Sequence, residues 1–340
     1  MERGTGQEGA GASGQTGPSA LPPSTVLRVP AELAGLRADA YLFRELPAVS
    51  RSRIRQKIQM GESLLNGGRF STSTRLRSGD VIRVTWRTAP RDEPVSDLAV
   101  LFEDDVLLAV DKPAGIASHP MGRHQSGTVV QFARRRFDAA IRESLGRGDV
   151  SFYPTLVNRL DVFTSGIVIV AKTADVHRAM QEMTMRRLIR REYVALVEGV
   201  IGDREGTIDL PLGPDPASGV RVKMAVRGDG RPSSTRYEVM ERLPSCTLVR
   251  VRPLTGRQHQ IRVHLAALGH PVVGDLLYKD EALFIAAQEP GGRGAAQRHC
   301  LHAERAIFIH PLTGAEIRIE APIPADFQRI VELMRGGSAP

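Results

Sequence analysis

The sequence predicts an α+β fold, in which a mixed, largely antiparallel β-sheet with flanking helices follows a small α/β module. Two observations lead to this prediction. Residues 26–86 combine two helical patterns with a turn and an alternating strand in one short segment. Residues 98–332 are dominated by strand patterns, interrupted by a few amphipathic segments. No repeat of fixed period runs along the chain, which argues against a solenoid.

The first 25 residues consist largely of Gly, Ser, Pro and Thr, with few large apolar side chains. Such a segment cannot bury enough surface to offset the entropy lost on ordering, so we expect 1–25 to form a disordered tail. It lacks the apolar core of a secretory signal, and no run in the chain approaches the roughly 20 apolar residues that span a bilayer. Cys246 and Cys300 give neither a zinc spacing nor a disulfide framework. We therefore expect a cytoplasmic protein without a membrane segment.

Residues 26–86 are expected to form the small module. Apolar residues at helical spacing predict a first helix in 36–46. Ser50 is a suitable N-cap for a second helix that ends near residue 60. Asn66-Gly67-Gly68 has the composition of a hairpin turn, and the alternation in 77–86 predicts a strand.

A longer domain, residues 98–334, is expected after a linker at 87–97, which carries two prolines and mixed charge. The last residues, 335–340, are expected to form a flexible terminus. The domain begins with a predicted hairpin, 98–112, that turns at 103–105. Further helices are expected in 127–145 and 256–271, and further strands in 158–173, 191–199, 234–242, 245–253, 305–311 and 315–322.

The chain is basic, with a net charge of +8 and a sequence pI near 10.0, which suggests a polyanionic partner. Between residues 35 and 85, ten Lys or Arg accompany only four acidic residues. Several of them lie on the second helix, opposite Ile54 and Ile58, where they could follow RNA phosphates without reading sequence. These basic residues are Arg51, Arg53, Arg55 and Lys57. The alternative is an ordinary solvent-exposed charged face.

The same segment resembles the small RNA-binding module named after the fourth protein of the small ribosomal subunit. The resemblance depends on Ser50–Arg53, Gly61, Asn66-Gly67 and Gly79-Asp80. It implies that this part of the chain binds structured RNA, and it implies no chemistry.

A candidate reactive carboxylate lies in NRLDVFTSGIVIVAKT, residues 158–173. Asp161 follows Arg159 and precedes an apolar run that is typical of a buried strand. A carboxylate beside a core strand stays ionised only when a cation or several N–H groups pair with it, and GRQHQIR offers Arg257 and Arg262. Held in this way, Asp161 could act as a nucleophile or a general base. The alternative is a structural ion pair.

Other catalytic chemistries have little support in the sequence. His259 and His264 are five positions apart, which does not align them as the zinc pair of a helix. Neither a phosphate-binding Gly-rich loop nor a GxSxG motif is present. We therefore expect no metal site. Tyr193 alternates with Ala195 and Val197, so it is either a core residue or an aromatic surface for a base extracted from RNA.

Four blocks, taken in order, resemble the RluA family of RNA pseudouridine synthases. They are residues 101–120, 158–173, 191–199 and 252–278. With the basic module in front, the arrangement resembles the large-subunit rRNA branch of that family. The resemblance implies a catalytic domain of the pseudouridine-synthase type. It also implies an isomerase that converts uridine to pseudouridine in RNA without a cofactor.

The resemblance implies a role for each matching residue. Asp161 corresponds to the catalytic Asp of the RLD motif, and Arg159 to the basic residue that enters the RNA stack as the uridine leaves it. Tyr193 corresponds to the tyrosine that packs on the base, and Arg262 to the arginine that pairs with the catalytic carboxylate. Arg257, in the same block, is expected to contact RNA. Whether Asp161 attacks C1′ or C6 of the nucleotide, or removes a ribose proton, stays open.

The implied partner is RNA, either 23S-type ribosomal RNA or tRNA, and the protein is expected to act as a monomer. Two positions depart from the family pattern: Asn158 replaces the His that usually precedes the RLD motif, and Asp111 stands where Asn is frequent. A non-catalytic RNA-binding or ribosome-assembly factor on the same scaffold is an alternative function. A glycoside hydrolase with an Asp nucleophile is another, although a second carboxylate at a matching position is lacking.

Overall fold

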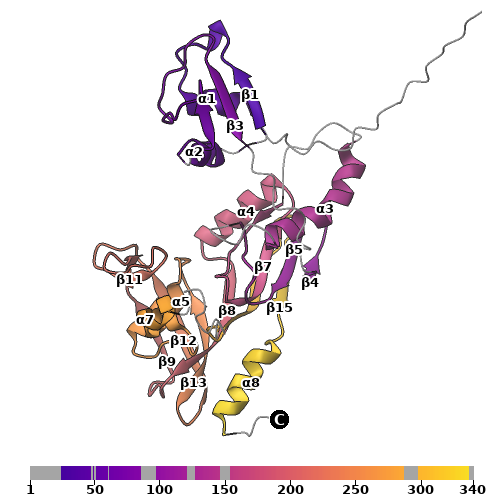
Figure 1. The fold of residues 1–340 in the computed structure, drawn as a ribbon. Coiled ribbons are helices and arrows are strands. Elements are labelled where there is room, and N and C mark those ends of the chain that lie inside the picture. The colour runs from indigo at the N-terminus through magenta and orange to yellow at the C-terminus, as the bar shows by residue number, and fades with distance from the viewer. Residues whose placement is uncertain are drawn as a thin grey trace, which may run out of the picture. The chain divides into compact units, whose positions relative to one another are not determined.

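The computed structural model describes residues 24–46, 49, 51–59, 61–85, 97–120, 127–145, 154–286 and 298–336. The chain forms two compact units, residues 1–91 and 92–340 (Figure 1). The division falls within the stretch whose composition predicts a linker. Residues 1–23 of the predicted tail and 337–340 of the predicted flexible terminus lie outside the described residues.

The first unit contains a three-stranded antiparallel sheet in the order β1-β3-β2. Its elements are β1 (Ser24–Arg28), the 3-10 helix η1 (Ala31–Leu33), α1 (Ala38–Glu45), α2 (Arg51–Gln59), β2 (Ser63–Leu65) and β3 (Val81–Thr85). The prediction that Ile54 and Ile58 face inward is confirmed, because both are at most 3% exposed and pack with Tyr41 and Ile82. β1 was not expected, and its first two residues, Ser24 and Thr25, belong to the segment 1–25 that was predicted to be a disordered tail. β1 is ordered by pairing with β3, a partner that local sequence does not reveal.

The turn at Asn66-Gly67 differs from the predicted hairpin in its strand partner. Both residues adopt the left-handed conformation, with φ of 49° and 82°. The chain that follows the turn makes only an isolated bridge, and β2 pairs instead with β3. Asn66 secures this arrangement, because its side chain donates to Asp80 and accepts from the Val81 N–H, each at 2.9 Å.

The second unit is built on a ten-stranded sheet in the order β4-β5-β7-β14-β8-β13-β12-β9, with β15 beside β14 and β6 beside β7. Its strands are β4 (Ala99–Glu103), β5 (Leu107–Lys112), β6 (Thr155–Leu156), β7 (Ser165–Ala171), β8 (Arg190–Glu198), β9 (Glu205–Asp209), β12 (Ser234–Arg242), β13 (Cys246–Pro253), β14 (Leu301–Ile309) and β15 (Glu316–Glu320). A separate antiparallel pair joins β10 (Leu212–Pro214) to β11 (Met224–Val226). Among the described strands of the large sheet, β7 and β14 pair in parallel and all other pairs are antiparallel.

Helices cover this sheet in two groups. α3 (Val129–Leu145) and α4 (Ala174–Met185) pack on β7, and α5 (Gln260–Ala267) packs on β12 and β13 (Figure 1). The remaining helices are α6 (Leu276–Lys279), α7 (Glu281–Ala286) and α8 (Ala325–Met334). The predicted fold class, a mixed and largely antiparallel sheet with flanking helices, is confirmed. In the part of the chain described, no helix is long and apolar enough to cross a membrane.

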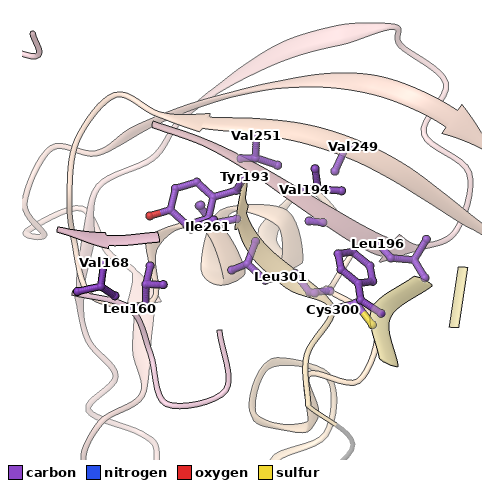
Figure 2. Packing of buried hydrophobic residues seen from close by; sticks show 14 of the residues in the cluster. Leu160, Val168, Tyr193, Val194, Leu196, Val249, Val251, Ile261, Cys300 and Leu301 are labelled. Atoms are coloured by element: carbon purple, nitrogen blue, oxygen red, sulfur yellow. The ribbon is translucent and has the colours of Figure 1, made fainter. Parts of the chain in front are cut away.

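The largest apolar cluster surrounds the central strands. β8 and β13 pair so that Val194, Leu196, Val249 and Val251 are all buried (Figure 2). Both faces of β8 are covered, which explains the continuous apolar run of residues 193–197. Both cysteines are also buried, Cys246 in β13 and Cys300 immediately before β14. This rigid centre supports the loop that carries the candidate catalytic carboxylate.

Candidate active site

Asp161 lies in the loop between β6 and β7, and the residues on both sides of it are tied to the segment after β5. Lys112 is fully buried, and its Nζ donates to the carbonyls of Pro113, Ile116 and Val162 at 2.9, 2.8 and 3.0 Å. Ser118 makes a reciprocal pair with Leu160: its Oγ donates to the carbonyl at 2.9 Å and accepts from the N–H at 3.0 Å. The backbone of Asp161 is therefore held from Leu160 and from Val162.

The far end of the same loop is held by β14. Thr164 Oγ1 lies 2.7 Å from Nε2 of His299. Gly166 has a φ of 108°, and a Cβ at that position would lie 2.2 Å from the carbonyl oxygen of Ala303. Only glycine allows this approach of the two backbones, which is the point where β7 and β14 pair in parallel.

Asn158, which replaces the usual His of the family pattern, binds the backbone of β7 through its side-chain amide. Its Nδ2 donates to the Ile167 carbonyl at 3.1 Å, and its Oδ1 accepts from the Ile169 N–H at 2.8 Å. These two groups lie on β7 between the stretches that pair with β14 and with β6. The amide therefore replaces a strand neighbour at this edge of β7.

The Asp161 carboxylate is paired with Arg262 of α5, 101 positions away. Arg262 Nη1 donates to Asp161 Oδ2 at 3.0 Å. The other side of the guanidinium binds Asp275, from Nε to Oδ2 at 2.6 Å and from Nη2 to Oδ1 at 2.8 Å. The Arg262 and Asp275 side chains are 8% and 2% exposed, whereas that of Asp161 is 28% exposed. The buried Asp275 carboxylate thus fixes the Arg262 guanidinium, and Nη1 of that guanidinium binds the more accessible Asp161 carboxylate.

This environment keeps Asp161 ionised. Burial by itself would raise the pKa of Asp161, but His259 whenever it is protonated, and the permanently charged Arg262, oppose it and lower the pKa to about 2. Burial would also lower the pKa of Arg262, and its hydrogen bonds to Asp275 with the charge of Asp161 instead raise that pKa above its usual value. At neutral pH the site contains a charged, acceptor-only carboxylate beside a permanently charged guanidinium.

Tyr193 of β8 completes the apolar side of the site. It is 7% exposed and belongs to the same cluster as Leu160 and Ile261. In Figure 2 its hydroxyl points to the side on which Leu160, the neighbour of Asp161, lies. Burial raises the pKa of Tyr193, and the Asp161 carboxylate adds to this rise, so the two groups interact electrostatically. Asn158, Arg191 and Tyr193 line a common pocket.

The predicted RNA-binding residues are placed in different ways. Arg159 is exposed next to Asp161. Arg257, offered by the sequence as a second source of a cation, is half-buried and donates to the Pro232 carbonyl at 3.3 Å. Of the two arginines, Arg262 is the one that pairs with Asp161. The side chains of Arg51 and Arg53 lie outside the described residues.

Two predicted residues of α2 behave differently from one another. Arg55 is exposed and pairs with Asp39 at 3.3 Å. Lys57 differs from the prediction of a phosphate-facing cation: it is 6% exposed, and its Nζ donates to Glu62 and to the Thr85 carbonyl at 3.0 and 2.6 Å. The end of β3 covers this side chain, which removes it from the surface available to RNA.

Sequence reasoning missed four residues of the site: Lys112, Asp275, His259 and Tyr278. The signals were present, because Lys112 belongs to VDKPAG and the other three lie in the block 252–278. No local pattern says which carbonyl or carboxylate a side chain will meet. No group of three or more His, Cys, Asp and Glu suited to a metal ion occurs among the described residues.

Comparisons with known proteins agree with this arrangement. The family model described as RNA pseudouridylate synthase matches residues 106–267. The chain is 38% identical to the ribosomal large subunit pseudouridine synthase D of Xanthomonas campestris, covering 92% of each protein. It is 35% identical to the ribosomal large subunit pseudouridine synthase C of Salmonella typhi, covering 92% of this chain and 98% of the relative.

A solved structure of an RNA pseudouridylate synthase domain has a similar fold. The human RNA pseudouridylate synthase domain containing 1 superposes with a TM-score of 0.51 at 25% identity, covering 74% of this chain and 99% of that one. These comparisons leave the resemblance of the first unit to the ribosomal-protein module as a prediction. The second unit carries the matched family model, an ionised carboxylate in the RLD motif and an arginine that fixes it, and the chain belongs to the RluA family of RNA pseudouridine synthases.

Proposed function

We propose that the protein isomerises uridine to pseudouridine in large-subunit ribosomal RNA, with Asp161 as the catalytic carboxylate. One observation carries the assignment of the residue: Asp161 is ionised and partly accessible, while its backbone and its charge partner are both fixed. The names of the relatives from Xanthomonas and Salmonella support the choice of large-subunit RNA.

The reaction breaks the N1–C1′ bond, turns the uracil and joins C5 to C1′. The proton on C5 is released and N1 takes up a proton, so the product is an isomer of uridine. The reaction conserves the remaining atoms and consumes no co-substrate. Attack by Asp161 on C1′ or on C6 and removal of a ribose proton all begin from the same ionised carboxylate. The Arg262 guanidinium holds that carboxylate in its charged form and in one orientation.

The neighbouring residues prepare the nucleotide. A base in a helix must leave its stack before C1′ or C6 can be reached. Arg159, exposed two positions before Asp161, fills the space that the uridine vacates, and the buried ring of Tyr193 supports the uracil. Neither role requires these residues to exchange a proton with the substrate.

The test of this proposal is Asp161→Asn, which preserves size and one acceptor oxygen for Arg262 but removes the charge. Release of tritium from RNA labelled at uridine C5 should be abolished, while RNA binding persists. Because Arg262 keeps Asp275, thermal unfolding should show an intact fold. Asp175→Asn, on the exposed face of α4, is the matched control and should behave as the unaltered protein. Normal turnover by Asp161→Asn would disprove the assignment.

The RNA itself is identified by a second experiment. Pseudouridine is mapped in total RNA from cells with and without the gene for this protein. Loss of one or more sites confined to large-subunit rRNA supports the proposal, whereas loss confined to tRNA would contradict it. No change in any RNA, together with RNA binding, would favour an assembly factor.

We also propose that exposed arginines of the first unit contact RNA phosphates. Arg55, Arg69, Arg77 and Arg83 are all exposed. Binding to phosphates releases counterions, so the logarithm of the binding constant falls linearly with the logarithm of the salt concentration. Replacing Arg69 and Arg77 by Gln should weaken binding and reduce the magnitude of this slope by about one for each lost contact. Arg178→Gln, on α4, is the control outside this unit. An unchanged salt dependence would contradict this role.

A further inference from the structure

His259 lies beside the Asp161 carboxylate, on the same oxygen that Arg262 contacts. Its Nε2 is 3.8 Å from Asp161 Oδ2, and its side chain is 10% exposed. Among the described residues, the only hydrogen bond to the carboxylate also goes to Oδ2, from Arg262. Oδ1 is therefore left for the substrate.

The position of His259 is unusual for its residue type. It forms the N-cap of α5 with φ 54° and ψ 15°, in the left-handed region that non-glycine residues rarely occupy. Such strain persists where the surrounding structure fixes it, and it concentrates at functional sites. Here it places the imidazole between α6 and the loop that carries Asp161.

Tyr278 of α6 fixes the orientation of this imidazole. Its hydroxyl lies 2.7 Å from His259 Nδ1, and the two rings meet edge to face, with centroids 5.7 Å apart and an interplanar angle of 86°. The Arg262 guanidinium lies 4.9 Å from the centre of the same Tyr278 ring. Tyr278 therefore contacts both residues that reach Asp161 Oδ2.

The hydrogen bonds of Tyr278 select one tautomer of His259. Its oxygen already accepts from the Met224 N–H at 3.1 Å, and burial raises the pKa of the phenol, so its proton stays in place. Donation of that proton to Nδ1 is the arrangement that leaves no buried donor unused among the described partners. Nε2 then carries the hydrogen and directs it toward Asp161.

His259 is uncharged in this arrangement. Burial lowers the pKa of His259, and although Asp161 and Asp275 oppose this effect, Arg262 adds to it. The neutral ring offers a single N–H group to the carboxylate and adds no second cation to the site. Hydrogen bonds in an empty active site are often long and shorten when substrate binds.

We infer that His259 is a positioning residue for the catalytic carboxylate, in which its Nε2–H, oriented by Tyr278, joins Arg262 in holding Oδ2 so that Oδ1 reacts with the uridine. This inference rests on the proposed function, because it assumes that Asp161 is the reacting group. It extends the contacts of the carboxylate from one residue to a chain of three: Met224, Tyr278 and His259.

The experiment compares substitutions that differ in one N–H group. His259→Gln places an amide N–H near the position of Nε2, whereas the shorter side chain of His259→Asn reaches only the position of Nδ1. Asn also adopts the left-handed backbone more readily than His, so it relieves strain rather than adding it. We expect kcat of His259→Asn to fall about tenfold or more with KM within twofold, and His259→Gln to stay within about threefold of the unaltered protein.

Tyr278→Phe tests the chain without altering His259. It removes the hydroxyl alone, and kcat should fall about fivefold to tenfold with an unchanged KM. In the His259→Asn background the same substitution should cause no further loss, because the two residues act through one path. Equal kcat for His259→Asn, His259→Gln and the unaltered protein would overturn the inference, as would additive losses in the double variant.

The outcomes separate this inference from the proposed function. If Asp161→Asn is inactive and His259→Asn is fully active, the positioning role fails and the catalytic assignment stands. If Asp161→Asn retains turnover, the proposed mechanism itself fails. Should His259→Asn not fold, as judged by thermal unfolding, Tyr278→Phe carries the test, and normal kcat in that variant would overturn the inference.

Discussion

Lys112 donates a hydrogen bond at 3.0 Å to the carbonyl of Val162, the residue that follows Asp161, across 50 positions of sequence. The same ammonium group binds the carbonyls of Pro113 and Ile116, so three carbonyls from two chain segments converge on one buried side chain. A long, flexible side chain is an expensive way to join loops, because its burial costs both entropy and desolvation. Because Lys112 binds the residue next to Asp161, we attribute this cost to its role in holding the catalytic loop.

Lys112→Met should therefore reduce both stability and turnover. The substitution keeps the volume but leaves the Pro113 and Ile116 carbonyls without a donor, while the Val162 carbonyl keeps only the Gly115 N–H at 2.8 Å. This should lower the free energy of unfolding by about 2 kcal/mol or more. The loop that carries Asp161 loses one of its anchors, so kcat should fall even though Gly115 still binds Val162 and Ser118 still holds Leu160. Urea unfolding and tritium release measure the two effects, and unchanged kcat would contradict the anchoring role.

The stability contributed by Lys112 should depend on pH in a definite direction. Burial lowers the pKa of Lys112 from 10.5 to about 7. Between these two values the unfolded chain binds a proton that the folded protein lacks, so raising the pH favours folding. The difference in unfolding free energy between the unaltered protein and Lys112→Met should rise from about pH 7 toward about pH 10.5. A flat difference across this window would contradict the lowered pKa.

Gly166→Ala should disrupt the parallel pairing of β7 and β14. Its Cβ would lie 2.2 Å from the Ala303 carbonyl oxygen, at a φ of 108°. We expect a loss of about 3 kcal/mol or more in unfolding free energy, since backbone must move. Gly115→Ala is the control: its φ is 90° but no atom lies within 4 Å of the added Cβ. That variant should lose only about 1 kcal/mol, and equal losses would contradict the close approach.

Asn158→Ala should separate structure from catalysis at the position that departs from the family pattern. Two hydrogen bonds to β7 disappear, leaving the Ile167 carbonyl and the Ile169 N–H without partners, so stability should fall by about 1–3 kcal/mol. The pH dependence of turnover should not change, because the amide does not titrate. Guanidinium unfolding and a pH–rate profile measure both, and a shifted profile would show that residue 158 affects the chemistry.

Arg262→Met should be more damaging than the loss of either carboxylate. It leaves Asp275, 2% exposed, as a buried charge without its arginine, which should lower stability by about 3–5 kcal/mol. Adding Asp275→Leu should restore much of the stability, because an apolar pair replaces an ionic one. Turnover should stay low in the double variant, since Asp161 has still lost its cation. Recovery of turnover together with stability would contradict the role of Arg262 at Asp161.

The sequence predicted most of the central sheet but not what surrounds it. β8 was recognisable because both of its faces are buried, which makes its apolar run continuous. β13 was recognisable because valines alternate with arginines along it. α4 was not predicted, although Val176 and Met180 are four positions apart and both are buried. Its pattern is short and rich in polar residues, so only packing against β7 distinguishes it from a loop.

At the site, family motifs located Asp161 and Arg262, whereas their surroundings depend on tertiary structure. Asp275 binds two N–H groups of Arg262 because the chain turns back after α5. Lys57 is buried because its Nζ binds the carbonyl of Thr85, the last residue of β3. Helical spacing alone gave Lys57 the same status as Arg55. Contacts with other segments determine which of the two side chains is exposed, and the residue pattern within α2 carries no information about those contacts.

The two cysteines make the protein a convenient background for site-specific labelling. Burial raises the pKa of Cys246 and raises that of Cys300 to about 12, so neither forms the thiolate that reacts with maleimides. They are the only cysteines in the chain. A cysteine introduced at exposed Ser78 and another at exposed Arg178 would be the only reactive thiols. A fluorescent donor and acceptor at these two places would report the distance between the two units directly, with and without RNA.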